Sequence, residues 1–378
     1  MDHFQTFRTP LSWCLLLLGF GVCILHRFRR RKAVESVSRP ITPLKKAEPE
    51  YSEDAYYDIE PLHDFDVDNE EPLKVRPFRP KFHMTMAIEN TTLSDLVAMD
   101  KTYRERIQIR KELIEKERHE VLAVNKKAEP AVLEIYEWLT STYLPTRFPS
   151  IFTPTGLDLR NNITGALLPL HLTDAEFALE LMGENVDDEF LFLLPSDKPE
   201  DEKRYRLEAF MTCFPSGFNT RSKLNLLLAE IHTPVPGYQQ KLEKSMDRFF
   251  AMLPVGKIVK RFNWSISTNA ELFCLKGNHM SEEELESKDQ YEDFDLKKTF
   301  LRCERQTLHR LPKSGALVFA FKTYMYPIQE LRDEGSGEIL AEAIDGLALG
   351  TVPGITIYKR QVVWGTKVKA FLRGEIDS

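Results

Sequence analysis

The chain has 378 residues, of which 42% are hydrophobic and 29% charged, a composition typical of a globular protein and not of a disordered one. Its formal net charge of −7 argues against a general nucleic-acid binder, because phosphate backbones select basic surfaces. The five cysteines show neither zinc-site spacing nor a disulfide framework, which favours a reducing compartment.

The N-terminus contains an uncharged apolar run, LSWCLLLLGFGVCIL at residues 11–25, followed at once by the basic stretch HRFRRRK. This pattern predicts a membrane anchor over residues 1–32, a single transmembrane helix with a cytosolic basic flank. The run is shorter than the usual span of about 20 residues, so flanking aromatic and arginine side chains have to extend it. A cleaved signal peptide is the alternative, but its basic residues would precede the run. The expected localisation is a single-pass membrane protein, in a membrane such as the endoplasmic reticulum, with its body in the cytosol.

Residues 33–79 contain six prolines among acidic and polar residues and show no sustained hydrophobic period. Such a composition is typical of a disordered, acidic and proline-rich tether. Aromatic residues interleave with the acidic ones in residues 51–71, so weak docking on a surface is the alternative to full solvation.

The folded body is expected over residues 80–370. After a short strand near residue 85, a helix is predicted to open at Thr92, and a second helix precedes Pro145. Beyond residue 185 alternating strands dominate, with helices predicted at residues 242–253 and 337–347. This order predicts an α+β fold built on an antiparallel sheet with flanking helices, preceded by a helical segment and the transmembrane helix.

Motifs for redox cofactors are missing from the sequence. The stretch GSGEIL at residues 335–340 lacks the third glycine of a dinucleotide fingerprint, and there is no phosphate-binding loop or iron–sulfur cysteine spacing. Any electrons that the protein uses must therefore come from another protein.

Two stretches remain as candidate sites. In the first, His232 precedes a turn stiffened by Pro234 and Pro236, which would hold an imidazole at a fixed angle. The alternative is a histidine with a purely structural role. In the second, residues 302–313, several basic residues surround a short apolar insert and could clamp carboxylates, or form an ordinary salt-bridge network.

The chain resembles the haem-dependent oxidative N-demethylase alpha-subunit family over about residues 80–350. The likeness rests on the joint occurrence of several words in the sequence: MAIENTTLSDLVAMDKTYRERIQIRKELI, FPSGF, LAEIHTPVPGY, MDRFF, RFNWSI, ERQTLHRLPKSGA and FAFKTY.

The resemblance implies a PAS-like domain that carries b-type haem and oxidises the methyl group of a small secondary amine with dioxygen, as a monooxygenase. Electrons would come from a reductase or electron-transfer partner with flavin and iron–sulfur centres. It implies His232 as the iron ligand, with contacts to the haem propionates and polar lining from Lys223, Arg305, Arg310, Asn263 and Tyr324. A haem sensor or carrier without turnover, and a membrane-tethered scaffold that has lost haem, are the alternatives, because a fold does not guarantee a function.

Overall fold

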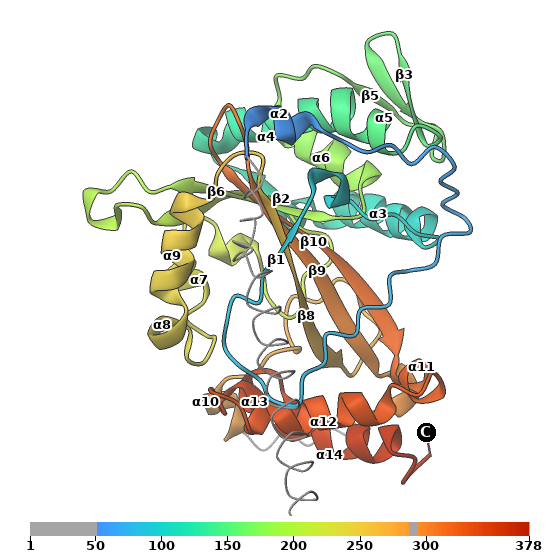
Figure 1. Cartoon of the computed structure of the whole chain (residues 1–378), viewed down its shortest axis with the longest axis vertical. Helices are drawn as coiled ribbons and strands as arrows, with labels where there is room; N and C mark the ends of the chain where they lie inside the picture. The colour runs from blue at the N-terminus through green and yellow to red at the C-terminus, as the bar shows by residue number, and fades with distance from the viewer. Residues whose placement is uncertain (1–50, 287–293, 378) are drawn as a thin grey trace, which may run out of the picture. The chain divides into compact units, whose positions relative to one another are not determined.

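The structure is a computed structural model that describes residues 51–286 and 294–377. Residues from Tyr51 onward form one compact unit. Its centre is an antiparallel sheet with the strand order β1-β8-β9-β10-β6-β7-β2 (Figure 1). The strands of this sheet are β1 (Glu89–Thr91), β2 (Leu122–Val124), β6 (Glu189–Pro195), β7 (Tyr205–Met211), β8 (Ile258–Ser267), β9 (Phe300–Arg310) and β10 (Leu317–Pro327).

The two longest strands, β9 and β10, form a hairpin whose pairing runs from Arg310–Leu317 to Phe300–Pro327. Gly315 in the connecting turn has a φ of +69°, a conformation that glycine adopts at little cost. Successive side chains of a strand point to opposite faces. We call the face with the even-numbered side chains of β9 the first face, and the other the second face.

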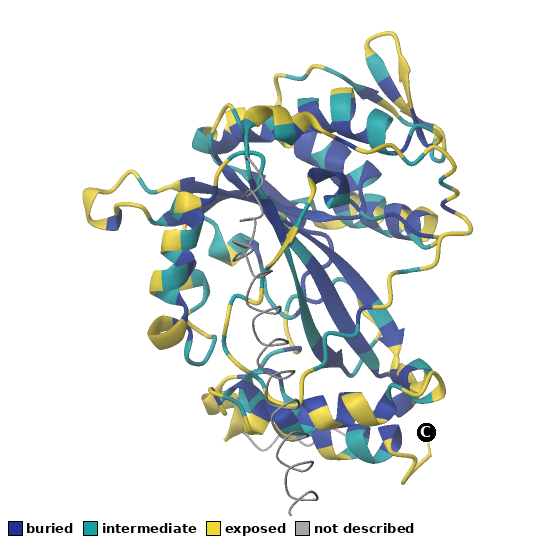
Figure 2. Ribbon diagram, in the orientation of Figure 1, coloured by how far each residue is buried: buried dark blue, intermediate teal, exposed yellow. Residues whose placement is uncertain are grey.

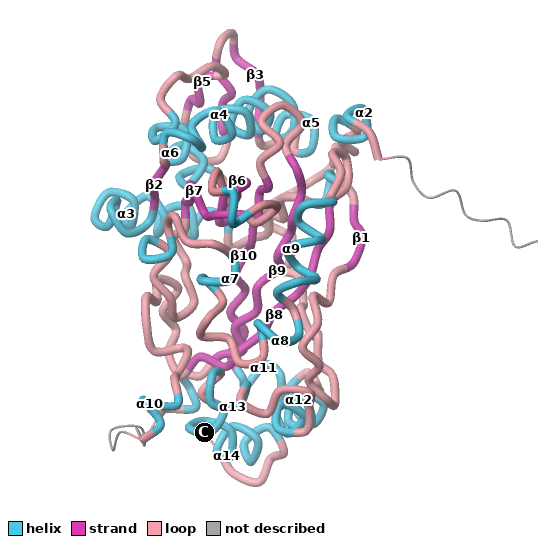
Figure 3. Tube along the Cα trace, turned by 90° about the vertical axis from the view of Figure 1, so that its left-hand side faces the viewer, coloured by secondary structure: helices cyan, strands magenta, loops and turns pink. Residues whose placement is uncertain are grey.

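The first face is covered by three short helices, α7 (Leu228–Ile231), α8 (Tyr238–Lys241) and α9 (Glu243–Met252). Figure 3 views the molecule from this side, with these helices in front of the sheet. Met246 and Phe250 of α9 pack with Leu308 of β9 and Leu317 of β10 in one hydrophobic cluster. The helical spacing of the apolar residues at 242–253 predicted this helix, and the structure confirms it.

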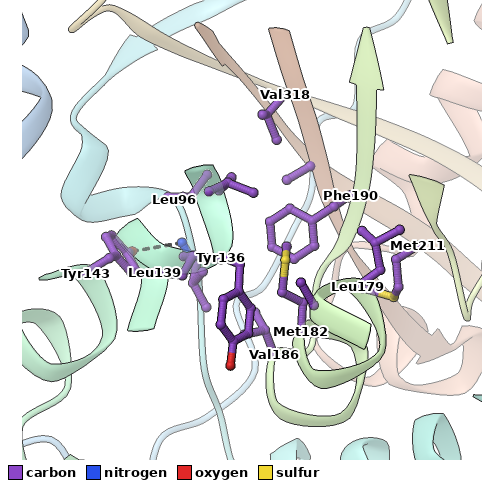
Figure 4. Close-up of a cluster of buried hydrophobic side chains, with 14 of the residues drawn as sticks. Leu96, Tyr136, Leu139, Tyr143, Leu179, Met182, Val186, Phe190, Met211 and Val318 are labelled. Carbon is purple, nitrogen blue, oxygen red and sulfur yellow. Dashed lines mark hydrogen bonds between the residues drawn. The ribbon is translucent and has the colours of Figure 1, made fainter. Parts of the chain in front are cut away.

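The second face packs against helices from the first half of the body, α3 (Tyr103–Val121), α4 (Glu129–Trp138) and α6 (Ala175–Asn185). Figure 4 shows the centre of this core, where Phe190 and Val318 of the sheet meet Tyr136, Leu179 and Met182. Strand β6 reads EFLFLLP because most of its side chains are buried. Further elements here are the helices α2 (Glu53–Tyr57) and α5 (Leu144–Arg147) and a small sheet of β3 (Phe152–Thr155), β4 (Asp158–Asn161) and β5 (Leu167–Pro169).

The far ends of β8–β10 pack on a third cluster formed with C-terminal helices. Trp364 and Phe371 fill its centre and are buried, as Figure 2 shows for the inner faces of these helices. The helix predicted at residues 337–347 is present as α12. The remaining helices are α10 (Glu282–Leu285), α11 (Ile328–Asp333), α12 (Gly337–Ala348), α13 (Ile355–Tyr358) and α14 (Gln361–Leu372).

One local expectation is corrected in the first part of the body. The helix expected to open at Thr92 is only a single 3₁₀ turn, Leu93–Asp95, and the long helix begins at Tyr103. The reason is that nearly every position of this stretch is buried, which a helix with one solvated face would not allow. The buried residues are Leu93, Ser94, Leu96, Val97, Met99 and Asp100.

Residues 51–79 pack on the body, where the sequence pattern predicts a disordered tether. Tyr56, Ile59, Val67 and Val75 are all buried and belong to the hydrophobic clusters. The aromatic and aliphatic residues between the acidic ones thus hold the segment against the body. The average composition of the segment does not show this, because the buried residues are few and spaced apart. The portion at residues 33–50 lies outside the described residues.

The structure corrects the membrane part of the fold prediction. Among residues 51–286 and 294–377, no helix is long and apolar enough to cross a bilayer. The segment expected to do so, residues 11–25, lies outside the described residues. The fold is therefore α+β with a large antiparallel sheet, and the single-pass, cytosol-facing localisation is corrected with it, because no described helix supports it.

Candidate functional site

His232 lies directly after α7, on the first face of the sheet. Its Nδ1–H donates to the carbonyl oxygen of Leu228 at 2.7 Å, and its ring stacks on Tyr238 with 4.6 Å between centroids and 11° between planes. With the proton on Nδ1, the lone pair is on Nε2. No hydrogen bond to Nε2 occurs in the described part of the chain.

The electrostatic surroundings keep this imidazole neutral. Burial, assisted by the charges of Lys223 and Arg261, lowers the pKa of His232 to about 4. The side chain is nevertheless only half-buried, so its ring retains contact with solvent. A neutral, oriented imidazole with a free Nε2 is what a metal needs from a histidine ligand.

The turn after His232 fixes its position. The backbone N–H of Val235 donates to the carbonyl of His232 at 2.9 Å, and Gly237 has a φ of +73°. A Cβ at Gly237 would lie 2.7 Å from Cγ2 of Val352, so only glycine allows the turn to pack this closely. The turn is therefore held by packing against Val352 as well as by the two prolines.

Two basic side chains face the same region without an ion-pair partner among residues 51–286 and 294–377. Lys223 ends a short 3₁₀ turn, Arg221–Lys223, with its Nζ 4.4 Å above the ring of Phe218. Arg261 lies on β8, and its buried Nε has no hydrogen-bond partner among the described residues. Burial lowers the pKa of both groups, and Glu304 partly offsets this effect.

The strand register places Asn263 on this face as well. Asn263 is paired with Glu304, and Arg261 with Gln306. The Oδ1 of Asn263 accepts from Nζ of Lys359 at 3.3 Å, and Glu304 accepts from Gln306 at 2.8 Å. In Figure 2 this stretch of β8 is only partly buried, in contrast to the neighbouring strand β9.

Arg305 and Tyr324 point to the second face of the sheet and do not meet His232. Arg305 forms an ion pair with Asp95, 2.8 Å between Nη2 and Oδ1, and also donates to the carbonyl of Leu96. Tyr324 is buried and stacks on Tyr326. Sequence motifs alone do not show which face of the sheet a strand residue occupies, because the register of strand pairing is unknown from the sequence.

Arg310 is on the first face, but its donors are already engaged. The guanidinium donates to the carbonyls of Phe250, Leu253 and Gly315 at 2.6–2.7 Å and to the hydroxyl of Tyr205 at 3.0 Å. It ties the end of α9 to the β9–β10 turn, which is a structural role.

The residues that the structure brings together are thus His232, Lys223 and Asn263 from the expected set, with Arg261 in addition. In the sequence, Arg261 reads as one of the polar residues that alternate with apolar ones along a strand. It could have been found by noting that this charged side chain lies on the same face of β8 as buried residues such as Val259.

This group of side chains fits a haem. Four of the six positions around the iron belong to the porphyrin, so one imidazole with a free nitrogen is enough to hold it. Lys223 and Arg261 are half-buried cations that form no ion pair among the described residues, so they suit the propionate carboxylates. No group of three or more histidine, cysteine or acidic side chains in the described ranges could hold a metal ion by itself.

Comparison with known proteins identifies the family of the chain. The family model for haem-dependent oxidative N-demethylase, alpha subunit-like, matches residues 87–369, which include the whole sheet and every residue of the site. At the level of the family, this means an oxidative, haem-dependent function that needs a source of electrons. The chain belongs to the haem-dependent oxidative N-demethylase, alpha subunit-like family.

Proposed function

We propose that the protein binds haem b through Nε2 of His232 and oxidises an N-methyl group of a small amine with dioxygen. The observation that carries the proposal is the neutral His232 imidazole, held by Leu228 and Tyr238. Beside it are Lys223 and Arg261, two cations that form no ion pair within the described part of the chain. Family membership supplies the reaction class.

When bound, the haem supplies dioxygen activation. The overall reaction takes the methylated amine, one dioxygen, two electrons and two protons to the demethylated amine, formaldehyde and one water. The electrons have to come from a reductase or electron-transfer partner with flavin or iron–sulfur centres, since this chain has no motif for either cofactor.

Each residue of the site has a definite part in this proposal. The hydrogen bond from Nδ1 of His232 to Leu228 orients the ring and raises the basicity of Nε2. Lys223 and Arg261 bind the propionates, and Asn263 lines the site as a polar group oriented by Lys359. We do not include Arg305, Arg310 or Tyr324, because their side chains are engaged elsewhere.

The α+β architecture also supports a PAS-like assignment of the domain. Its antiparallel sheet has helices α7–α9 inserted between β7 and β8, so that they cover one face and leave His232 above the strands.

The decisive experiment is a visible spectrum of the purified protein after reconstitution with haem b. We expect a Soret band that is lost or strongly shifted in His232→Ala. The control is His171→Ala, which removes a histidine whose side chain is 74% exposed. A colourless wild-type protein, or an unaltered band in His232→Ala, would overturn the proposal.

A second measurement separates an enzyme from a haem sensor or carrier. With a supplied reductase, we expect oxygen consumption that depends on a small methylated amine and produces formaldehyde. If haem binds but no such amine yields formaldehyde, the protein is a haem-binding member of the family without turnover.

A further inference from the structure

Two buried charges of opposite sign lie on the first face without an ion pair. Glu304 of β9 is 8% exposed, and its carboxylate accepts a hydrogen bond from Nε2 of Gln306 at 2.8 Å. Lys359, which follows α13, is 6% exposed and donates to Oδ1 of Asn263 at 3.3 Å and to the carbonyl of Trp264. Neither Glu304 nor Lys359 forms an ion pair with any described residue. Since buried charges are normally paired, each can bind a charged group of a ligand.

The strand register brings these two charges to one place. Asn263 of β8 and Thr323 of β10 both lie directly opposite Glu304, so all three side chains point to the first face. Directly opposite residues of an antiparallel pair have their Cβ atoms about 5 Å apart. The ammonium of Lys359 is thus bound to the side chain that faces Glu304 across the strands. Burial lowers the pKa of Lys359 to about 8, and the charge of Glu304 partly offsets this effect.

The surface around these charges is polar as well. The hydroxyl of Thr323 is buried and has no hydrogen-bond partner among the described residues, whereas Asn263 is only half-buried. The strand is covered at either side, because Leu308 packs with α9 and Arg302 donates to the carbonyls of residues 271–272. An unpaired polar group inside a protein costs free energy. A carboxylate, an ammonium and a hydroxyl left unpaired side by side therefore indicate a site for a polar ligand.

The signs of the charges select the kind of ligand. A simple alkylamine is a cation at neutral pH, so Glu304 attracts it but Lys359 repels it, as does Arg261, whose charge reaches Lys359. A simple carboxylate is attracted by Lys359 and repelled by Glu304. A molecule with an ammonium and a carboxylate a few bonds apart meets an opposite charge at each end. Two opposite charges that do not neutralise each other therefore suit a zwitterion.

We propose that the substrate is an N-methylated amino acid, whose ammonium is bound by Glu304 and whose carboxylate is bound by Lys359. This inference rests on the proposed function and names its substrate class. Asn263 holds the Lys359 ammonium in place, and Thr323 contacts the ligand beside Glu304. For N-methylglycine, the reaction with one dioxygen, two electrons and two protons gives glycine, formaldehyde and one water.

The test is calorimetric titration of the haem-loaded protein with N-methylglycine, dimethylamine and butyrate. Dimethylamine lacks the carboxylate, and butyrate has the shape of N-methylglycine without its amine. We expect N-methylglycine to bind at least about tenfold more tightly than either of the others, because each of these loses a hydrogen bond between charged groups.

Two substitutions remove one charge each. In Glu304→Gln, N-methylglycine should bind no better than butyrate, and in Lys359→Met it should bind no better than dimethylamine. The Soret band should be retained in both variants, because neither side chain is assigned to the haem. The control is Asp197→Asn, whose carboxylate is 82% exposed and which should bind the three probes as the wild type does. If Lys359→Met does not fold, the probes compared in the wild type and in Glu304→Gln decide the matter.

The outcomes distinguish this inference from the proposed function. If the protein binds no haem, the proposed function fails and the substrate class fails with it. If haem is bound but N-methylglycine binds no better than dimethylamine, or Glu304→Gln still prefers N-methylglycine to butyrate, only the substrate class is overturned. The same holds if none of the three probes binds to the haem-loaded protein.

Discussion

Arg110 of α3 and Glu189 of β6 form an ion pair entirely inside the protein, with 2.6 Å between Nη1 and Oε1. Glu189 also accepts from the backbone N–H groups of Cys213 and Phe214, and Arg110 donates to the carbonyl of Gly183. The pair therefore joins a helix, the central sheet and the segment that leads to the candidate site.

Arg110→Met should lower the free energy of unfolding by about 3–5 kcal/mol, because it leaves a buried carboxylate without its cation. Chemical denaturation measures the effect. The control is Arg104→Met, which breaks the exposed Arg104–Asp68 pair and should cost no more than about 1 kcal/mol. Equal effects of the two substitutions would contradict the role given to the buried pair.

Asp188 makes stability fall as the pH rises. Burial raises its pKa from 3.8 to about 8, against the opposing charges of Arg305 and Lys322, and neither carboxyl oxygen has a hydrogen-bond partner among the described residues. Between these two values the folded state holds a proton that the unfolded state has released, so raising the pH favours unfolding.

We therefore expect Asp188→Asn to flatten the pH dependence of the melting temperature above about pH 4 and to stabilise the protein at about pH 8 relative to wild type. Asp197→Asn is the control, since this carboxylate is 82% exposed. A wild-type melting temperature that rises from pH 5 to pH 8, with the same rise in Asp188→Asn, would exclude this role.

Residues 51–79 belong to the fold. A chain that starts at residue 80 loses the buried side chains of Tyr56, Ile59, Val67 and Val75, and burial of an aliphatic side chain of this size is worth about 1.5–3 kcal/mol. We expect this chain to be cut by protease at far lower concentrations than a chain that starts at residue 51. Equal resistance of the two chains to protease would contradict this prediction, because it would mean that residues 51–79 do not stabilise the body.

Substitutions of the basic residues on the first face should have two different effects, one on haem binding and one on stability. Lys223→Ala and Arg261→Ala should weaken haem binding with little loss of stability, because neither side chain has an ion-pair partner within the described ranges. Arg310→Met should destabilise the protein, because it removes five hydrogen bonds, to backbone carbonyls and to the hydroxyl of Tyr205. Its haem affinity, measured by titration below the unfolding temperature, should remain that of the wild type.

The sequence was sufficient for the local elements and for part of the site. Apolar residues at helical spacing predicted α9 and α12, and alternation predicted the strands, because these patterns report which side of an element is buried. His232 could be proposed because a histidine before two prolines is unusual and because the surrounding words resemble a family. The N-terminal apolar run led to a membrane prediction that no described helix supports.

Only the tertiary structure decided which of the predicted site residues meet. Arg305 and Gln306 are neighbours in the chain but lie on opposite faces of β9, and the pairing of Asn263 with Glu304 assigns the faces. Lys223 and Arg261 come from a turn and a strand, and nothing in their separate sequence neighbourhoods links them to each other or to His232. The sequence by itself determines which surfaces are apolar and which turns are rigid, through local sterics and side-chain periodicity. The register of long-range strand pairs determines the site, because a shift of one residue would carry every side chain of a strand to the other face.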